Sequence, residues 1–154
     1  EGNKATLNRL NGLSPFDYTR WTNRFKSLVN LSRTHRIDGD FAFTHGAVGE
    51  EIWDNYSFRV PKKIESKMLY GETSGLIGED GLPERTYDWV DKIPKDKIVV
   101  VGHDIRKTSE PLVQTNAKGG KVIFLDTGCG KGGQLTSLDI TLDGEPKLGM
   151  FFVH

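Results

Sequence analysis

Cysteine, long apolar runs and net charge are all scarce in this 154-residue sequence. The single cysteine, Cys129, excludes an internal disulfide and a cysteine-based zinc cluster, and it favours a reducing compartment such as the cytoplasm. No segment approaches the roughly 18 to 20 consecutive apolar residues of a membrane span, and no secretion signal stands out. We therefore expect a soluble, cytoplasmic protein with no membrane partner.

The charges cancel, because 21 lysines and arginines balance 21 aspartates and glutamates. Without a basic excess, a nonspecific grip on long nucleic acid or acidic lipid is disfavoured. The length and the 36% hydrophobic content suit one ordinary globular domain. Neither an internal repeat nor a linker divides the sequence, so residues 1–154 are predicted to form a single domain.

A helix is predicted from Pro15 to about Arg33. Ser14 supplies an N-cap, Pro15 suits the first helical position, and Asp17 follows three residues after the cap. An apolar stripe recurs at helical spacing along the segment: Trp21, Phe25, Leu28 and Ser32. We expect this stripe to pack in the core, with docking to a membrane or a partner helix as the alternative.

Short apolar runs predict buried strands at residues 41–44, 98–101 and 121–125, and a more exposed strand at 135–140. Residues 47–97 are rich in turn signals, and we expect a short helix around residues 87–90. Six side chains are the expected packing anchors of that long stretch: Trp53, Tyr56, Phe58, Met68, Leu69 and Tyr70.

The three buried strands end at residues with metal-binding chemistry. His45 follows the first strand, His103 the second and Asp126 the third. Strand ends on one edge of a sheet converge on a common crevice, and two imidazoles with a carboxylate are the composition of a metal site. The structural alternative is that the histidines are ordinary strand-end residues, and that Asp126 forms a turn or orients a histidine.

The glycine-rich run Asp126–Gly132 permits a different interpretation. It resembles the D-x-G-x-G-x-G loop of S-adenosylmethionine methyltransferases, although too little sequence follows Gly132 for the strands and helices that such a fold requires. A phosphate-binding P-loop is excluded, because Lys131 is followed by Gly132 where serine or threonine is needed.

Six motifs occur in a fixed order between about residues 39 and 140. They are Phe41–Gly46, Leu69–Thr73, Gly81–Arg85, Val99–His103, Leu125–Cys129 and Gly132–Leu138. Together they resemble the calcineurin-like metallophosphoesterases. The most similar branch includes bacterial and phage serine/threonine phosphatases, diadenosine tetraphosphatase-like enzymes and the phosphatase domain of polynucleotide kinase-phosphatases.

This resemblance implies an α/β fold, the C-terminal half of a layered αββα sandwich with a mixed sheet and flanking helices. It also implies hydrolysis of a phosphoester by metal-activated water, with two divalent ions, manganese first and nickel, iron or zinc as alternatives. By resemblance, His45 and His103 bind the second metal, Asp126 supports catalysis, and Arg85 contacts the phosphate.

The sequence departs from the family pattern in two respects. Asp104 replaces the usual threonine after Gly-His, and Ile105 excludes the G-H-x-H variant. The D-x-H, G-D-x-x-D-R-G and G-N-H motifs, which supply the other metal ligands, do not occur, and Glu1–Lys4 resembles the residues that follow G-N-H. The chain is therefore interpreted as a fragment, one half of a divided enzyme, or a non-catalytic descendant.

A half-sandwich exposes apolar surface and a sheet edge, so a partner is expected: a second polypeptide or the missing N-terminal half. Alone, the chain is expected to be inactive. The alternative is a non-catalytic binding or regulatory subunit. The substrate remains open between a nucleotide, a phosphoprotein and a nucleic-acid end.

Overall fold

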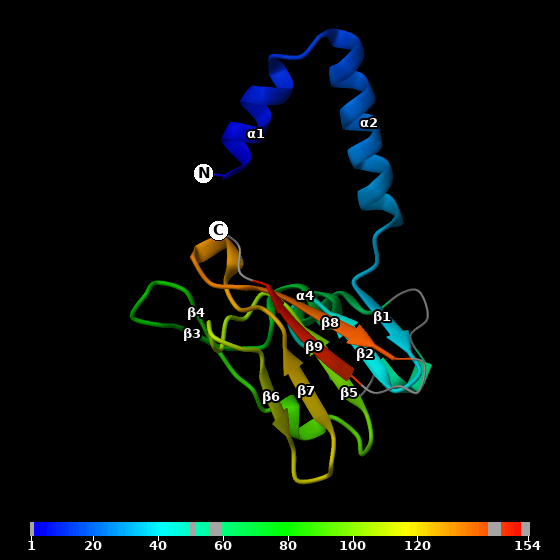
Figure 1. Cartoon of the computed structure of the whole chain (residues 1–154), viewed down its shortest axis with the longest axis vertical. Coiled ribbons are helices and arrows are strands. Elements are labelled where there is room, and N and C mark those ends of the chain that lie inside the picture. The colour runs from blue at the N-terminus through cyan, green and yellow to red at the C-terminus, as the bar shows by residue number, and fades with distance from the viewer. Residues whose placement is uncertain (1, 50–51, 56–59, 142–145, 152–154) are drawn as a thin grey trace. The chain divides into compact units, whose positions relative to one another are not determined.

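The computed structural model describes residues 2–49, 52–55, 60–141 and 146–151 (Figure 1). The chain forms two compact units, Glu1–Arg33 and Thr34–His154. The single domain expected from the composition stays a prediction. None of the helices in the described ranges is long and apolar enough to span a bilayer.

The first unit consists of two helices, α1 (Gly2–Asn11) and α2 (Pro15–Leu31). The predicted start of α2 is confirmed: the Ser14 hydroxyl accepts a 3.1 Å hydrogen bond from the Asp17 backbone N–H and donates one of 2.9 Å to the Asp17 carboxylate. Helix α1 was not predicted, because its residues are mostly polar and carry no apolar stripe.

The expectation that the α2 stripe lies in the core is wrong. None of the α2 residues is buried; Trp21 is 45% exposed and Phe25 is 67% exposed. Two helices of this length are too small to enclose a core between them. The Trp21 ring is covered instead by the guanidinium groups of Arg20 and Arg24, at 5.6 and 5.8 Å from its centroid.

The second unit is built on a five-stranded sheet in the order β1-β2-β5-β7-β6 (Figure 1). Its strands are β1 (His35–Asp38), β2 (Phe41–Thr44), β5 (Ile98–Val101), β6 (Leu112–Thr115) and β7 (Lys121–Phe124). The strands β2, β5 and β7 are parallel, and β1 and β6 pair antiparallel at the two edges. This mixed sheet with flanking helices confirms the predicted α/β class and the three predicted buried strands.

Helices and a β-hairpin cover the two faces of this sheet. On one face Ala42, Val99 and Phe124 pack in a buried cluster with Met68, Trp89 and other apolar residues. The cluster is closed by α3 (Ile52–Asn55), α4 (Lys62–Tyr70) and the 3₁₀ turn η1 (Val90–Lys92). This turn overlaps the short helix expected around residues 87–90 at Val90 alone, and Tyr87 and Trp89 precede it. On the other face Phe41, Val100 and Ile123 pack with Leu138 of β8 (Leu135–Ile140), which pairs with β9 (Pro146–Phe151).

The expected packing anchors divide three ways. Met68 is fully buried, Trp53 packs partly buried against the same cluster, and Leu69 is half-buried. Tyr70 is 64% exposed, so its assignment as an anchor is wrong; it is the last residue of α4, beyond the turn that faces the sheet. Tyr56 and Phe58 lie outside the described residues.

A second hairpin, β3 (Thr73–Ile77) with β4 (Pro83–Arg85), extends from the end of α4. A short 3₁₀ turn, η2 (Cys129–Lys131), follows β7. Side chains of the hairpin and of η2 line one cleft together with His103, which follows β5.

Candidate functional site

The parallel register places the ends of β2, β5 and β7 side by side. Thr44 pairs with Val101, and Val101 pairs with Phe124. His45 follows β2 directly, whereas His103 and Asp126 each stand two residues beyond β5 and β7. The ring centroids of His45 and His103 are 4.6 Å apart, with the planes tilted by 40°. The predicted convergence of the strand ends is therefore present in the structure.

His103 has an unusual backbone conformation. Its φ is +60°, in the left-handed region that residues other than glycine rarely adopt. The turn is closed by a 2.6 Å hydrogen bond from the Asp104 N–H to the Gly102 carbonyl. Such strained residues persist only where their surroundings hold them, and they concentrate at functional sites.

The surroundings of His103 favour its neutral form. Partial burial lowers the pKa of His103, and the positive charges of Arg85 and His45 lower it further. The carboxylates of Asp104 and Asp126 act in the opposite direction, and the net shift is downward. A neutral imidazole keeps a lone pair for a metal ion or a proton.

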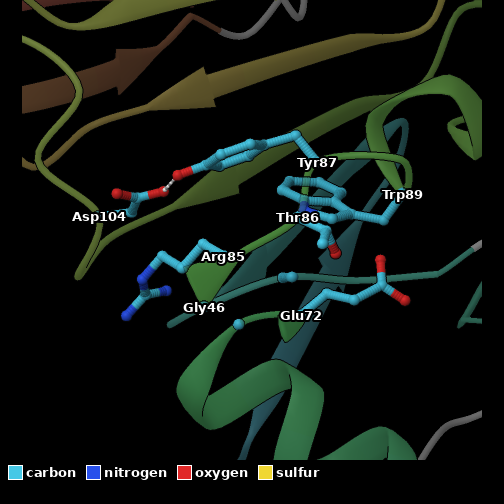
Figure 2. A pocket seen from close by; sticks show the side chains of 9 residues that line it. Gly46, Glu72, Arg85, Thr86, Tyr87, Trp89 and Asp104 are labelled. Carbon is cyan, nitrogen blue, oxygen red and sulfur yellow. Dashed lines mark hydrogen bonds between the residues drawn. The ribbon is translucent and has the colours of Figure 1, made fainter. Parts of the chain in front are cut away.

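The Arg85 guanidinium lies against Gly71, which in turn lies against Gly46, the residue after His45. A Cβ on Gly46 would lie 2.3 Å from the Gly71 nitrogen, and a Cβ on Gly71 would lie 2.4 Å from the Arg85 Nη1 atom. Gly71 also caps α4 with φ +84°. Figure 2 shows the Arg85 guanidinium on the same side of the pocket as Asp104, while the Glu72 carboxylate points the other way.

Asp104 is held by an aromatic neighbour. The Tyr87 hydroxyl donates a 2.8 Å hydrogen bond to Oδ2 of Asp104 (Figure 2). The Arg106 guanidinium lies 4.0 Å from the centroid of the Tyr87 ring. Burial raises the pKa of Tyr87, and the hydrogen bond and charge of Asp104 raise it further. Tyr87 therefore remains a protonated donor at neutral pH.

Asp126 begins a loop that is closed by its own backbone. Its Oδ1 accepts a 2.8 Å hydrogen bond from the Gly128 N–H. The N–H groups of Lys131 and Gly133 both donate to the Gly128 carbonyl, at 2.7 and 2.8 Å. A Cβ on Gly133 would lie 1.9 Å from the Thr127 carbonyl oxygen, so only glycine fits there. Asp126 thus forms the turn that the sequence allowed as an alternative. The negative charge of its carboxylate also raises the pKa of His103, against the net downward shift.

A cleft of about 480 Å³ opens beside this cluster. Arg85, His103 and Lys131 line it together with Asp104 and several apolar side chains. An arginine can bind two phosphate oxygens with its paired N–H groups, and a nearby lysine adds a point charge. The cleft therefore has the chemistry of an anion site next to the paired histidines.

His45, His103, Asp126 and Arg85 were named as site residues from the sequence, whereas Lys131 and Tyr87, which lie close to them in the structure, were not. Lys131 belongs to the glycine-rich run that follows β7. Its place in that run was the sequence feature that could have indicated a position near the strand ends. Tyr87 is separated from Asp104 by 17 residues and by β5, so sequence spacing gives no indication of their contact.

Two metal donors, His45 and His103, come together in the structure. In the part of the chain that the structure describes, no group of three or more histidine, cysteine or acidic side chains is arranged to hold a metal ion. The pair alone thus offers fewer protein ligands than the three or four that most tightly bound ions have.

No family model matches the sequence. Similar proteins named bis(5'-nucleosyl)-tetraphosphatase PrpE (asymmetrical) occur in several bacteria. The chain is 28% identical to the one from Halalkalibacterium halodurans over 139 residues, which is 89% of this chain and 52% of the relative. For Anoxybacillus flavithermus the identity is 32% over 122 residues, 78% of this chain and 45% of the relative.

The relative from Geobacillus thermodenitrificans is 27% identical over 139 residues, again 89% of this chain and 52% of the relative. The chain thus spans about half the length of the curated relatives it matches. These relatives are named as nucleoside tetraphosphatases, a kind of phosphoester hydrolase, which is the reaction class that the ordered motifs of this chain resemble.

Proposed function

We propose that this chain forms part of a metal-dependent phosphoesterase and supplies one side of its metal and substrate site. The observation that carries the proposal is the pairing of His45 and His103, whose ring centroids are 4.6 Å apart at the ends of parallel strands. The relatives named as nucleoside tetraphosphatases support the same reaction class.

The residues present fit a shared metal site. Imidazole nitrogens suit manganese, nickel, iron and zinc, and His45 and His103 would hold one such ion together. When bound, a divalent ion stabilises negative charge on phosphoryl oxygens. We propose two ions in the complete enzyme, manganese first, with the further ligands supplied by an N-terminal half that lies outside this sequence or by a second polypeptide.

The remaining side chains bind and orient the substrate. Arg85, held against Gly71, binds phosphate oxygens, and Lys131 contributes a second positive charge on the same cleft. Asp126 stabilises the loop after β7 by accepting a hydrogen bond from the Gly128 N–H. Its negative charge raises the pKa of His103. In this proposal Arg85 contacts the substrate, and Asp126 has a supporting role.

The proposed substrate is a nucleotide with a phosphate chain, because the relatives are named for a bis-nucleosyl tetraphosphate. A phosphoprotein and a nucleic-acid end are the alternatives from the sequence motifs. A cytoplasmic location is part of the proposal, and the single cysteine, Cys129, supports it.

The test is a manganese titration of the 154-residue chain. Electron paramagnetic resonance measures the concentration of the free ion at each step. We expect His45→Ala and His103→Ala each to weaken binding by on the order of tenfold or more, because each removes a donor. Asp139→Asn on the exposed face of β8 is the control and leaves binding unchanged. Manganese binding that is indifferent to both histidines would refute the proposed metal site.

A non-catalytic binding subunit is the second candidate, because His45 and His103 are the two donors brought together within the described part of the chain. To separate the two candidates, the chain is combined with the proposed additional N-terminal half. Phosphoester hydrolysis and phosphate binding by that complex are then both measured. Loss of hydrolysis in His103→Ala supports the enzyme. A complex that binds phosphate, hydrolyses nothing and ignores that substitution supports the subunit.

The methyltransferase alternative is tested separately by thermal shift. Stabilisation by manganese and none by S-adenosylmethionine is the expected result. The opposite pattern would show that the loop after β7 binds the methyl donor.

A further inference from the structure

We propose that the cleft beside Arg85 is a nucleoside subsite, in which an apolar wall formed by Tyr70, Leu82 and Ile105 receives a base while the cationic edge holds the phosphates. The inference rests on the proposed function and assigns the residues that would recognise the organic part of the substrate.

Four separate segments build the cleft. They are the end of α4, the β3–β4 hairpin, the turn after β5 and the turn η2 after β7. Its volume of about 480 Å³ falls within the range of roughly 300 to 1,000 Å³ that is usual for small-molecule sites. The cleft therefore has room for more than a phosphate group.

Positively charged and imidazole side chains line the cleft. Arg85, Lys131 and His103 are taken together as its cationic edge. The carboxylate that also lines the cleft, Asp104, already accepts the hydrogen bond from Tyr87. Two permanent positive charges against one engaged carboxylate favour an anion at this edge.

Apolar side chains line the same cleft, and two of them are largely exposed to solvent. Tyr70 is 64% exposed and Leu82 is 62% exposed, and the two come from different segments that meet at the cleft. A single exposed apolar side chain is ordinary, but two that line one cleft beside a cationic edge indicate a ligand surface. An aromatic face can stack any nucleobase.

The wall and the edge are directly connected through the backbone. Tyr70 precedes Gly71, and the Arg85 guanidinium lies against Gly71. A planar group on Tyr70 and an anion on Arg85 would therefore be neighbours. A nucleoside phosphate combines both in one compact molecule, and it fits a cleft of this volume better than an extended phosphopeptide does.

Isothermal titration calorimetry of the full 154-residue chain tests the assignment with ATP and inorganic tripolyphosphate, at equal manganese concentration and ionic strength. We expect ATP to bind about 5- to 150-fold more tightly than tripolyphosphate, the range expected for stacking of one base. Tyr70→Ala removes most of that advantage and leaves tripolyphosphate binding unchanged, whereas Tyr70→Phe retains it because the aromatic face remains.

Leu76→Ala is the matched control, since Leu76 is 65% exposed on β3 and is not among the residues that line the cleft. It leaves both affinities unchanged. Equal binding of the two probes, weakened alike by Arg85→Ala, overturns the nucleoside subsite and leaves the phosphate site of the proposed function standing. Binding of neither probe counts against the proposed function itself.

A phosphotyrosine peptide is the third probe. If it binds more tightly than ATP and loses affinity in Tyr70→Ala, the wall receives a peptide side chain and the nucleoside assignment is wrong. Circular dichroism of each variant confirms that the comparison is made between folded proteins.

Discussion

Tyr87 holds Asp104 by a 2.8 Å hydrogen bond, and Asp104 directly follows the left-handed residue His103. The Tyr87 ring in turn packs edge-on against Phe124 of β7, with ring centroids 6.0 Å apart. The turn that carries His103 is thereby fixed to the buried core of the sheet. An aspartate at position 104, where the related motif has threonine, acquires a structural role from this contact.

The first prediction is that Tyr87 positions His103. Tyr87→Phe keeps the ring and its contact with Phe124 but removes the hydrogen bond, so we expect a loss of about 1 kcal/mol in stability. Manganese affinity should fall with it, because the turn that orients His103 is released. Both are measured, by urea unfolding and by metal titration.

Tyr18→Phe, in the first unit, is the control and changes neither quantity by a comparable amount. Manganese affinity equal to that of the unmodified chain in Tyr87→Phe would show that the hydrogen bond stabilises the fold without positioning His103.

The second prediction concerns stability at high pH. Burial, followed by the hydrogen bond and charge of Asp104, raises the pKa of Tyr87 above its ordinary value of 10.0. The folded state thus favours the protonated phenol. This contribution to stability is fully present below pH 10 and is lost as the pH rises through the folded pKa of Tyr87.

Ultraviolet titration of tyrosinate follows this ionisation directly. Asp104→Asn is expected to lower the pKa of Tyr87 toward its ordinary value, since the negative charge that opposes ionisation is removed. If the pKa of Tyr87 were the same in Asp104→Asn as in the unmodified chain, Asp104 would not be a cause of its raised value.

The third prediction compares two glycines with nearly the same positive φ angle. Gly71 has φ +84° and Gly75 has φ +86°, but a Cβ meets Arg85 at Gly71 and nothing within 4 Å at Gly75. Alanine at either position should cost about 1 to 2 kcal/mol in unfolding free energy, because both residues have a positive φ that strains an L side chain. Only Gly71→Ala should weaken tripolyphosphate binding, by displacing Arg85.

Calorimetry with tripolyphosphate, paired with urea unfolding of each variant, separates backbone strain from the Arg85 contact. Equal losses of phosphate affinity in Gly71→Ala and Gly75→Ala would mean that backbone strain alone explains the effect.

The fourth prediction concerns Asn116, a buried side chain that connects two loops. Its Nδ2 donates to the carbonyls of Val90 and Ile93, both at 2.8 Å. Its Oδ1 accepts from the N–H groups of Lys118 and Gly120, both at 2.9 Å. Asn116→Ala leaves these buried groups unpaired and should cost about 3 kcal/mol.

Urea unfolding in a Trp21→Phe background measures this loss, because the tryptophan fluorescence then comes from the second unit. Gln114→Ala on the exposed face of β6 should change stability by less than about 0.5 kcal/mol. A comparable loss in both variants would show that the hydrogen bonds of Asn116 contribute little.

The central strands were predictable because their signals are local. Each of β2, β5 and β7 is a short apolar run that ends at glycine or a polar residue, and a strand buried on both faces needs no other pattern. Their parallel pairing then brings His45, His103 and Asp126 to one edge. Most of the candidate site followed from that one step.

The edge strands and the cleft depend on tertiary contacts. β1 has the polar sequence His35–Asp38 and becomes a strand by pairing with β2 after the turn at Gly39. Tyr70 and Lys131 meet at the cleft although a long stretch of sequence separates them. The apolar stripe of α2 shows the converse limit: helical spacing identifies an apolar face, but not whether another element covers it.

Thr44 and Val101 are neighbours in the sheet, but the whole connection through α4 and the β3–β4 hairpin lies between them in the chain. The entropy of closing that long loop must be overcome before the parallel pairing forms, so the histidine pair exists only once that pairing is in place. Any ligand that needs both imidazoles therefore binds only the fully folded second unit. Metal or phosphate in the growth medium would then raise the yield of native protein by mass action, independently of any turnover.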